Sequence, residues 1–213
     1  MKNELEAIEI LEKIFGSTAK VKIMRMFLFN RETPFGLNDI IVRTKIKKEI
    51  VKKEIIGLEK AGLLKKKSFT SEVPVKDKKT NKALKKKIVG WEVDENFPYL
   101  LPLQNFLIHI NPLKHTDILK KISSVGKIKL LVISGIFIQE FETRVDLLVV
   151  GDNLQEHKII SAIREIESEI GKELRYVIFS TEDFEYRLGM MDKLVRDILD
   201  FPHEKIIDKL EVR

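Results

Sequence analysis

The sequence predicts an α+β protein of two domains, with the boundary near residue 111. Charge is the first indication, because residues 1–100 carry 23 Lys+Arg and 14 Asp+Glu, whereas residues 101–213 carry 16 and 19. The front half shows amphipathic helices followed by a basic hairpin, and the back half alternates apolar strands with helices. That alternation is typical of a small α/β layer. The expected domains are therefore residues 1–110 and 111–213.

Apolar residues at helical spacing predict a helix over residues 4–15. A second helix is expected over Thr18–Phe29, with Ser17 as its N-cap. The apolar face of the first helix needs a partner, which is either its own domain or the same helix of a second subunit.

The next segment has the pattern of two helices joined by a tight turn. A short helix is expected over Leu37–Val42, a turn over Arg43–Lys45, and a longer helix over Ile46–Ala61 that ends at Gly62. The expected buried stripe of the longer helix consists of Ile46, Ile50, Ile55 and Leu58, with Val51 as a further candidate. Two strands, Leu64–Phe69 and Lys86–Val93, then form a basic hairpin with a long connection.

This order of helix, turn, helix, glycine and basic hairpin resembles the winged helix-turn-helix domain of transcription regulators. The resemblance implies that the second helix enters the DNA major groove while the hairpin, or wing, follows the flanking backbone or minor groove. The implied groove contacts are Thr44, Lys45, Lys47, Lys48 and Lys52, and the implied wing contacts are Lys78, Lys79, Lys82, Lys85, Lys86 and Lys87.

The basic charge is concentrated in this segment. Residues 43–87 contain 17 basic and 5 acidic residues, and lysines that neutralise phosphates supply most of the sequence-independent affinity for DNA. The alternative is a solvated, lysine-rich surface like that of thermophilic proteins. Because the excess of lysine is local, we favour a polyanion as partner. Asn, Gln and Arg are scarce on the presumed groove-facing side, so base recognition by hydrogen bonds is expected to be weak.

The back half is expected to alternate helices and strands in one layer. The expected helices are Pro112–Ser124, Leu154–Ile170, one or more over Thr181–Asp200, and Pro202–Leu210, and the expected strands are Ile128–Ile133, Arg144–Val150 and Leu174–Phe179.

The stretch VISGIFIQEFETRVDLLVVGD resembles the minimal nucleotidyltransferases of the DNA polymerase beta superfamily. In that family a Gly-Ser turn, an Asp-x-Asp strand and a third acidic strand hold two magnesium ions. Here Ser134-Gly135 inverts the turn, Arg144 replaces the first aspartate before Asp146, and the third strand has no acid. One carboxylate cannot hold two metals, so we expect no catalytic residues, no metal and no cofactor. Ser134, Gly135, Arg144 and Asp146 then form a vestigial nucleotide pocket, or Asp146 is simply a satisfied strand-end residue.

Other chemistry is not indicated. The chain has no cysteine, its four histidines lack metal-ligand spacing, and no apolar run is long enough to span a membrane. We therefore expect a cytoplasmic transcriptional regulator, not an enzyme. Its expected partners are double-stranded DNA, a second copy of the chain, and a nucleotide or small-molecule effector, with no membrane. The alternatives are an active nucleotidyltransferase of the toxin-antitoxin type and a C-terminal domain that serves only for oligomerisation.

Overall fold

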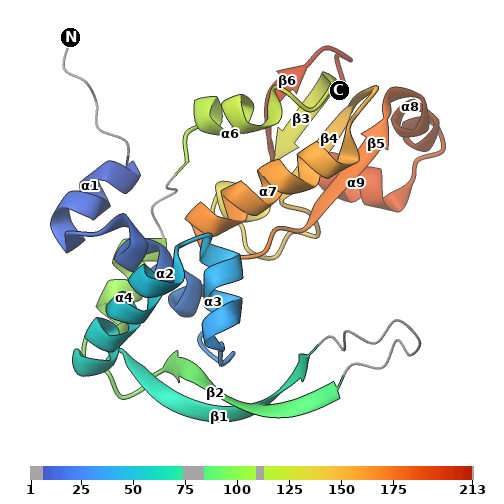
Figure 1. Ribbon diagram of the computed structural model, residues 1–213. Coiled ribbons are helices and arrows are strands. Elements are labelled where there is room, and N and C mark those ends of the chain that lie inside the picture. Colours follow the sequence, from blue (N-terminus) through green and yellow to red (C-terminus); the bar gives the residue numbers. More distant parts are fainter. Residues whose placement is uncertain (1–6, 74–83, 109–112, 213) are drawn as a thin grey trace. The chain divides into compact units, whose positions relative to one another are not determined.

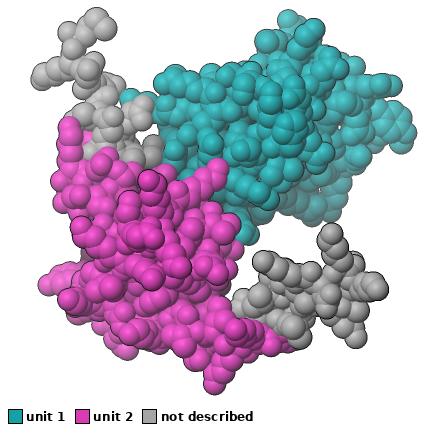
Figure 2. Space-filling model, in the orientation of Figure 1, with its two compact units in different colours: residues 1–8, 109–213 teal, residues 9–108 magenta. Residues whose placement is uncertain are grey.

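The computed structural model describes residues 7–73, 84–108 and 113–212, and it has a mixed α/β fold with two sheets (Figure 1). The chain separates into two compact units (Figure 2). Residues 9–108 form one, called here the N-terminal unit, and residues 1–8 with 109–213 form the other, the C-terminal unit. The division after residue 108 lies close to the boundary expected at residue 111.

The first four helices of the N-terminal unit follow the predicted order, and the fifth, after the hairpin, was not predicted as a helix. They are α1 (Ala7–Phe15), α2 (Thr18–Phe29), α3 (Leu37–Thr44), α4 (Lys48–Lys60) and α5 (Leu100–Ile108). The bounds of α2 are those predicted, because the Ser17 hydroxyl accepts a hydrogen bond from the Lys20 amide at 3.2 Å and fixes the start of the helix. The α3 helix runs two residues beyond the predicted end, and Lys45 then closes it in the left-handed conformation, with φ of 56°.

The hairpin spans the predicted residues 64–93, but its two strands are longer than predicted. β1 (Leu64–Val73) pairs antiparallel with β2 (Leu84–Val93), from Leu64 opposite Val93 outwards. At the base of the hairpin a short bridge joins Phe35 to Trp91, with both N–H···O distances at 2.9 Å. Gly90 allows this approach, because a Cβ atom there would lie 2.2 Å from the Phe35 carbonyl oxygen.

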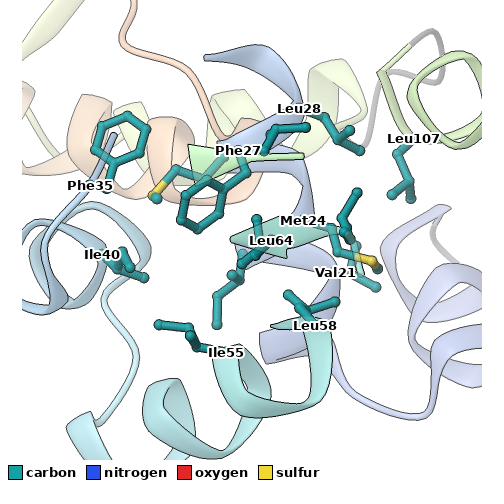
Figure 3. Packing of buried hydrophobic residues seen from close by; sticks show 14 of the residues in the cluster. Val21, Met24, Phe27, Leu28, Phe35, Ile40, Ile55, Leu58, Leu64 and Leu107 are labelled. Atoms are coloured by element: carbon teal, nitrogen blue, oxygen red, sulfur yellow. The ribbon is translucent and has the colours of Figure 1, made fainter. Parts of the chain in front are cut away.

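The core of the N-terminal unit lies between α2, α3, α4, α5 and the base of the hairpin (Figure 3). Phe27 of α2 meets Phe35 edge-on, with ring centroids 5.6 Å apart. Val51 of α4 is fully buried, whereas Ile50 is 42% exposed. The expected place of Ile50 in the buried stripe is therefore wrong by one position, and the core face of α4 consists of Val51, Glu54, Ile55 and Leu58.

The C-terminal unit alternates helices and strands as expected. Its elements are α6 (His115–Ile122), β3 (Lys127–Ile133), the 3-10 turn Gly135–Phe137, β4 (Leu147–Asp152), α7 (Glu156–Ile170), β5 (Tyr176–Ser180), α8 (Thr181–Gly189), α9 (Lys193–Asp200) and β6 (Glu204–Asp208). The strand order is β5-β4-β3-β6, with β4 and β5 parallel and the other neighbours antiparallel. The helix α7 joins the two parallel strands, as such a connection requires.

The last element corrects a prediction. Pro202–Leu210 was expected to be a helix, but Glu204–Asp208 is a strand that pairs with β3, with Leu131 opposite Ile207. The backbone N–H and C=O groups of β6 form hydrogen bonds with the free edge of β3 instead of with one another in a helix. Ile206 and Ile207 are adjacent, and two neighbouring apolar residues fit the 3.6-residue period of a helix as well as the two-residue period of a strand.

Candidate nucleic-acid interface

The predicted groove-facing lysines lie at the start of α4 and before it. Lys45 and Lys47 are exposed, and Lys47 is the residue that precedes the helix. Lys48 and Lys52 are exposed on one stripe of α4, one turn apart. Lys53, which the predicted site did not include, is exposed beside them.

Thr44 does not belong to this surface, which corrects the prediction. Its side chain is buried, with 2% of the residue exposed, and its hydroxyl donates a hydrogen bond to the Ile40 carbonyl at 2.6 Å. The residue closes the last turn of α3 from within. Its predicted position relied on α3 ending at Val42, two residues too early.

The lysines of α4 differ from those at the base of the hairpin in their ion pairs. Lys66 Nζ lies 3.3 Å from Glu59, and Lys67 Nζ lies 3.2 Å from Glu92. Among the ion pairs of the described residues, none involves Lys47, Lys48, Lys52 or Lys53. Their charge is therefore directed to solvent, where a polyanion would be attracted most strongly.

The hairpin lysines divide between its two faces. Lys85, Lys86 and Lys87 are all exposed on β2. Since side chains alternate along a strand, Lys85 and Lys87 share a face with Trp91, and Lys86 lies on the other face. The remaining predicted wing residues, Lys78, Lys79 and Lys82, lie outside the described residues.

The Trp91 face of the hairpin is the face that meets α4. Trp91 Nε1 donates to the Glu59 carboxylate at 3.3 Å. Glu59 lies eleven residues after Lys48 and seven after Lys52, so the three side chains project from the same side of the helix. Lys48 and Lys52 of α4 and Lys85 and Lys87 of the hairpin therefore belong to surfaces that adjoin along the Glu59–Trp91 contact.

The predicted vestigial pocket has a different structure. Ser134 and Asp146 are buried, with 4% and 2% exposure, and Gly135 lies between them with φ of 58°. A Cβ atom at Gly135 would lie 2.0 Å from Asp146 Oδ1, so the position admits only glycine. These three residues pack against one another, and the Ser134 hydroxyl donates to the Val145 carbonyl.

Arg175 fills the remaining space beside Asp146. The carboxylate accepts from Arg175 Nε and Nη2, each at 3.0 Å, and from the backbone N–H groups of Arg175 and Ile136 at 2.9 and 3.1 Å. The hydrogen bond to Asp146 raises the pKa of the Arg175 guanidinium against the opposing effect of desolvation. The Asp146 carboxylate is thus fully hydrogen-bonded immediately before β4, which agrees with its interpretation as a satisfied strand-end residue.

Arg144 is separated from the other three. Its Nε lies 3.0 Å from Asp197 Oδ2, and both residues line an open pocket of about 520 Å³. The rest of the lining consists of Glu140, Glu142, Thr143, Lys193, Phe201 and Pro202. Three carboxylates and two cations give this lining an acidic balance, which does not favour a triphosphate.

Neither family models, curated proteins nor solved structures gave a match to this chain. Across residues 7–73, 84–108 and 113–212, no group of three or more His, Cys, Asp or Glu side chains is arranged to hold a metal ion. In the same part of the chain no helix has the length and apolar character needed to cross a membrane.

Sequence reasoning missed two residues that the structure adds to these sites. Lys53 is exposed on α4 next to Lys52 but is not among the predicted groove contacts. Arg175 stands at the start of the third strand, 29 residues after Asp146, and the two meet only because β4 and β5 pair in parallel. The sequence did contain a signal for this pair, since Arg175 stands at the start of the strand in which the resembled family carries its third acid.

Proposed function

We propose that this protein is a DNA-binding transcription regulator. Its N-terminal unit would act as a winged helix-turn-helix domain, with α4 in the major groove and the β1–β2 hairpin as the wing. The observation that carries the proposal is the row of exposed lysines on α4, which form no ion pair with the carboxylates of the described residues. They lie beside a hairpin whose adjoining face carries Lys85 and Lys87.

The packing of the helices supports this assignment. The helices α2, α3 and α4 pack against each other in pairs, and the turn between α3 and α4 is only three residues long, at residues 45–47. A left-handed residue, Lys45, makes this sharp change of direction possible. The Phe35–Trp91 bridge then attaches the hairpin to the segment before α3. The lysines and the hairpin are therefore parts of one compact unit.

A salt titration tests the proposal. Binding of the whole chain to a short mixed-sequence DNA duplex would be measured by fluorescence anisotropy at several salt concentrations. Replacing Lys47, Lys48 and Lys52 together by alanine should weaken binding and reduce the slope of log K against log salt by up to about 2.7, since each phosphate contact contributes about 0.9.

A matched control removes the same charge elsewhere. Lys120, Lys127 and Lys158 are exposed residues of the C-terminal unit. Their triple alanine variant should keep the wild-type slope. Equal slopes for both triple variants, or no binding by the wild-type chain at any salt concentration, would exclude the α4 surface as a DNA interface.

For the C-terminal unit we propose a nucleotidyltransferase-like fold without transferase activity, kept in the regulator for dimerisation or for sensing a nucleotide or small molecule. Its support is the Arg175–Asp146 pair, which occupies the carboxylate that the family uses for metal. The active transferase is the second candidate. An active transferase would transfer label from ATP in the presence of magnesium, and this activity would disappear in Asp146→Ala. A sensor would bind a nucleotide in a calorimetric titration without transferring label. A domain that serves only for oligomerisation would show neither transfer nor binding.

We also propose that the chain forms a homodimer, and α1 is the element that favours it. Leu11 is buried in the core of the N-terminal unit, but Ile10 and Ile14 are 45% and 60% exposed. Among the described residues, α1 therefore buries one side of its apolar surface and leaves Ile10 and Ile14 largely exposed. Light scattering of the wild type and of Ile10→Ser/Ile14→Ser tests this, and a monomeric mass for the wild type would refute it.

A further inference from the structure

The outer face of α4 carries an apolar residue in the middle of its positive charge. Ile56 is 52% exposed, and the helical repeat places Lys52 and Lys53 one turn before it and Lys60 one turn after it. All three lysines are exposed. Gly57 follows Ile56, and a Cβ atom there would have no neighbour within 4 Å. The surface around Ile56 is therefore open as well as cationic.

The chemistry of α4 limits how it can distinguish bases. Its sequence, KEIVKKEIIGLEK, contains no Asn, Gln, Arg, Ser or Thr. These are the side chains, apart from lysine and the acids, that commonly form hydrogen bonds with base edges. The two acids nearest to Ile56 are both engaged: Glu59 with Lys66 and Trp91, and the buried Glu54 with Lys20. Besides lysine, which can read guanine, and Glu49, which is exposed two turns before Ile56 and could accept from cytosine, the exposed apolar side chain is the group on this face that can distinguish base pairs, through the thymine methyl.

We propose that Ile56 contacts the C5-methyl group of a thymine in the major groove, and that this contact gives the protein a preference for thymine at one position of its site. The inference rests on the proposed DNA-binding function. The thymine methyl is the one apolar group that base pairs present in the major groove. The lysines around Ile56 fit the duplex rather than an apolar protein partner, because they complement phosphates on either side of the groove.

Ile50 provides an internal comparison. It is also an isoleucine of α4 and is 42% exposed, but it lies six residues earlier and about 120° further round the helix. It therefore lies outside the group formed by Lys52, Lys53, Ile56 and Lys60. The same substitution can be made at both positions, on the same helix and with similar exposure.

The experiment begins with a random-sequence duplex library. Duplexes retained by the wild-type chain would be sequenced, and the best one resynthesised with uracil replacing each thymine singly, which removes only the methyl group. Wild type and Ile50→Ser should lose about fourfold in affinity at one or more of these positions, the effect of about one buried methyl group. Ile56→Ser should bind the thymine duplex about fourfold more weakly and no longer distinguish it from uracil.

The outcomes separate this inference from the proposed function. If the library yields no retained duplex, DNA binding and the thymine contact fail together. If the wild type binds DNA but is indifferent to uracil, or if Ile56→Ser still distinguishes uracil from thymine, only the thymine contact is refuted. A change of oligomeric mass in Ile56→Ser with thymine discrimination intact would instead assign Ile56 to a protein interface. Thermal unfolding by circular dichroism checks that each serine variant is folded.

Discussion

Replacing Asp146 by alanine should destabilise the C-terminal unit far more than replacing Arg144, although the two residues are close in the sequence. Asp146 is 2% exposed and accepts four hydrogen bonds, two of them from backbone N–H groups. Its removal leaves those two donors without a partner, at about 1–3 kcal/mol each. The Arg175 side chain is 44% exposed, so water screens its freed charge, and the two donors account for a total loss of about 2–6 kcal/mol.

Arg144→Ala is the matched comparison. Arg144 also forms an ion pair, but 57% of its side chain is exposed. Exposed pairs contribute between about 0 and 1 kcal/mol, so its loss should change the free energy of unfolding by less than about 1 kcal/mol.

Urea unfolding followed by far-ultraviolet circular dichroism would measure both variants. Trp91, the single tryptophan, lies in the N-terminal unit, so its fluorescence should report an unchanged transition there. Amide exchange in β4 should accelerate in Asp146→Ala alone. Equal destabilisation by the two substitutions would refute the structural role assigned to Asp146.

Three further predictions concern stability. Gly57→Ala should stabilise the N-terminal unit by about 0.5–1 kcal/mol because the added Cβ meets open space. Gly90→Ala should destabilise the same unit by about 1–3 kcal/mol, because its Cβ would clash with the Phe35 carbonyl. The urea unfolding transition followed by Trp91 fluorescence measures both changes, and a change of the same sign in both variants would contradict this geometry. Asp192→Ala should lower the free energy of unfolding by about 1 kcal/mol, because this carboxylate caps α9 by accepting from the Leu194 and Val195 amides at 2.9 and 3.2 Å. Thermal unfolding measures this loss, and Asp200→Ala, at the exposed end of the helix, is the control. Burial opposes the charged form of Asp208, but hydrogen bonds from Lys205 and from the Val212 and Leu210 amides outweigh it and lower the pKa of this carboxyl. A lowered pKa in the folded protein stabilises the fold at pH values above the pKa of the unfolded chain, about 3.9, and this stability is lost as the pH falls through the folded pKa. The free energy of unfolding should therefore fall more steeply with decreasing pH for the wild type than for Asp208→Asn. Parallel plots of this free energy against pH would contradict the role of these hydrogen bonds.

Local signals explain where the sequence predicted the fold well. The Ser17 cap and the apolar spacing after it fixed both ends of α2. The left-handed Gly171, with φ of 91°, ended α7 where expected. These features depend on residues within a few positions of one another, which is the range that periodicity and capping describe.

Pairing between residues far apart in the sequence explains where the predictions differ from the structure. The β6 strand exists because β3 offers a free edge more than 70 residues earlier in the chain, and no local pattern of Pro202–Leu210 contains that information. The Asp146–Arg175 pair depends on the parallel register of β4 and β5. At the start of α4, Ile50 was expected in the core but is 42% exposed, whereas Val51, named only as a further candidate, is fully buried. Single-residue errors of this kind matter most for the surface that would meet DNA.

The hairpin's lysines have a consequence apart from any partner. β1 and β2 form a two-stranded ribbon of ten residues each, and within the described part of the chain Phe35 alone bridges to its outer side, at the base. The remaining edges are templates for strand addition by neighbouring molecules, and closely spaced positive charges repel such neighbours. Variants that neutralise Lys85, Lys86 and Lys87 should therefore use glutamine or serine, because valine or isoleucine at these positions would create an aggregation-prone ribbon and simulate a loss of binding.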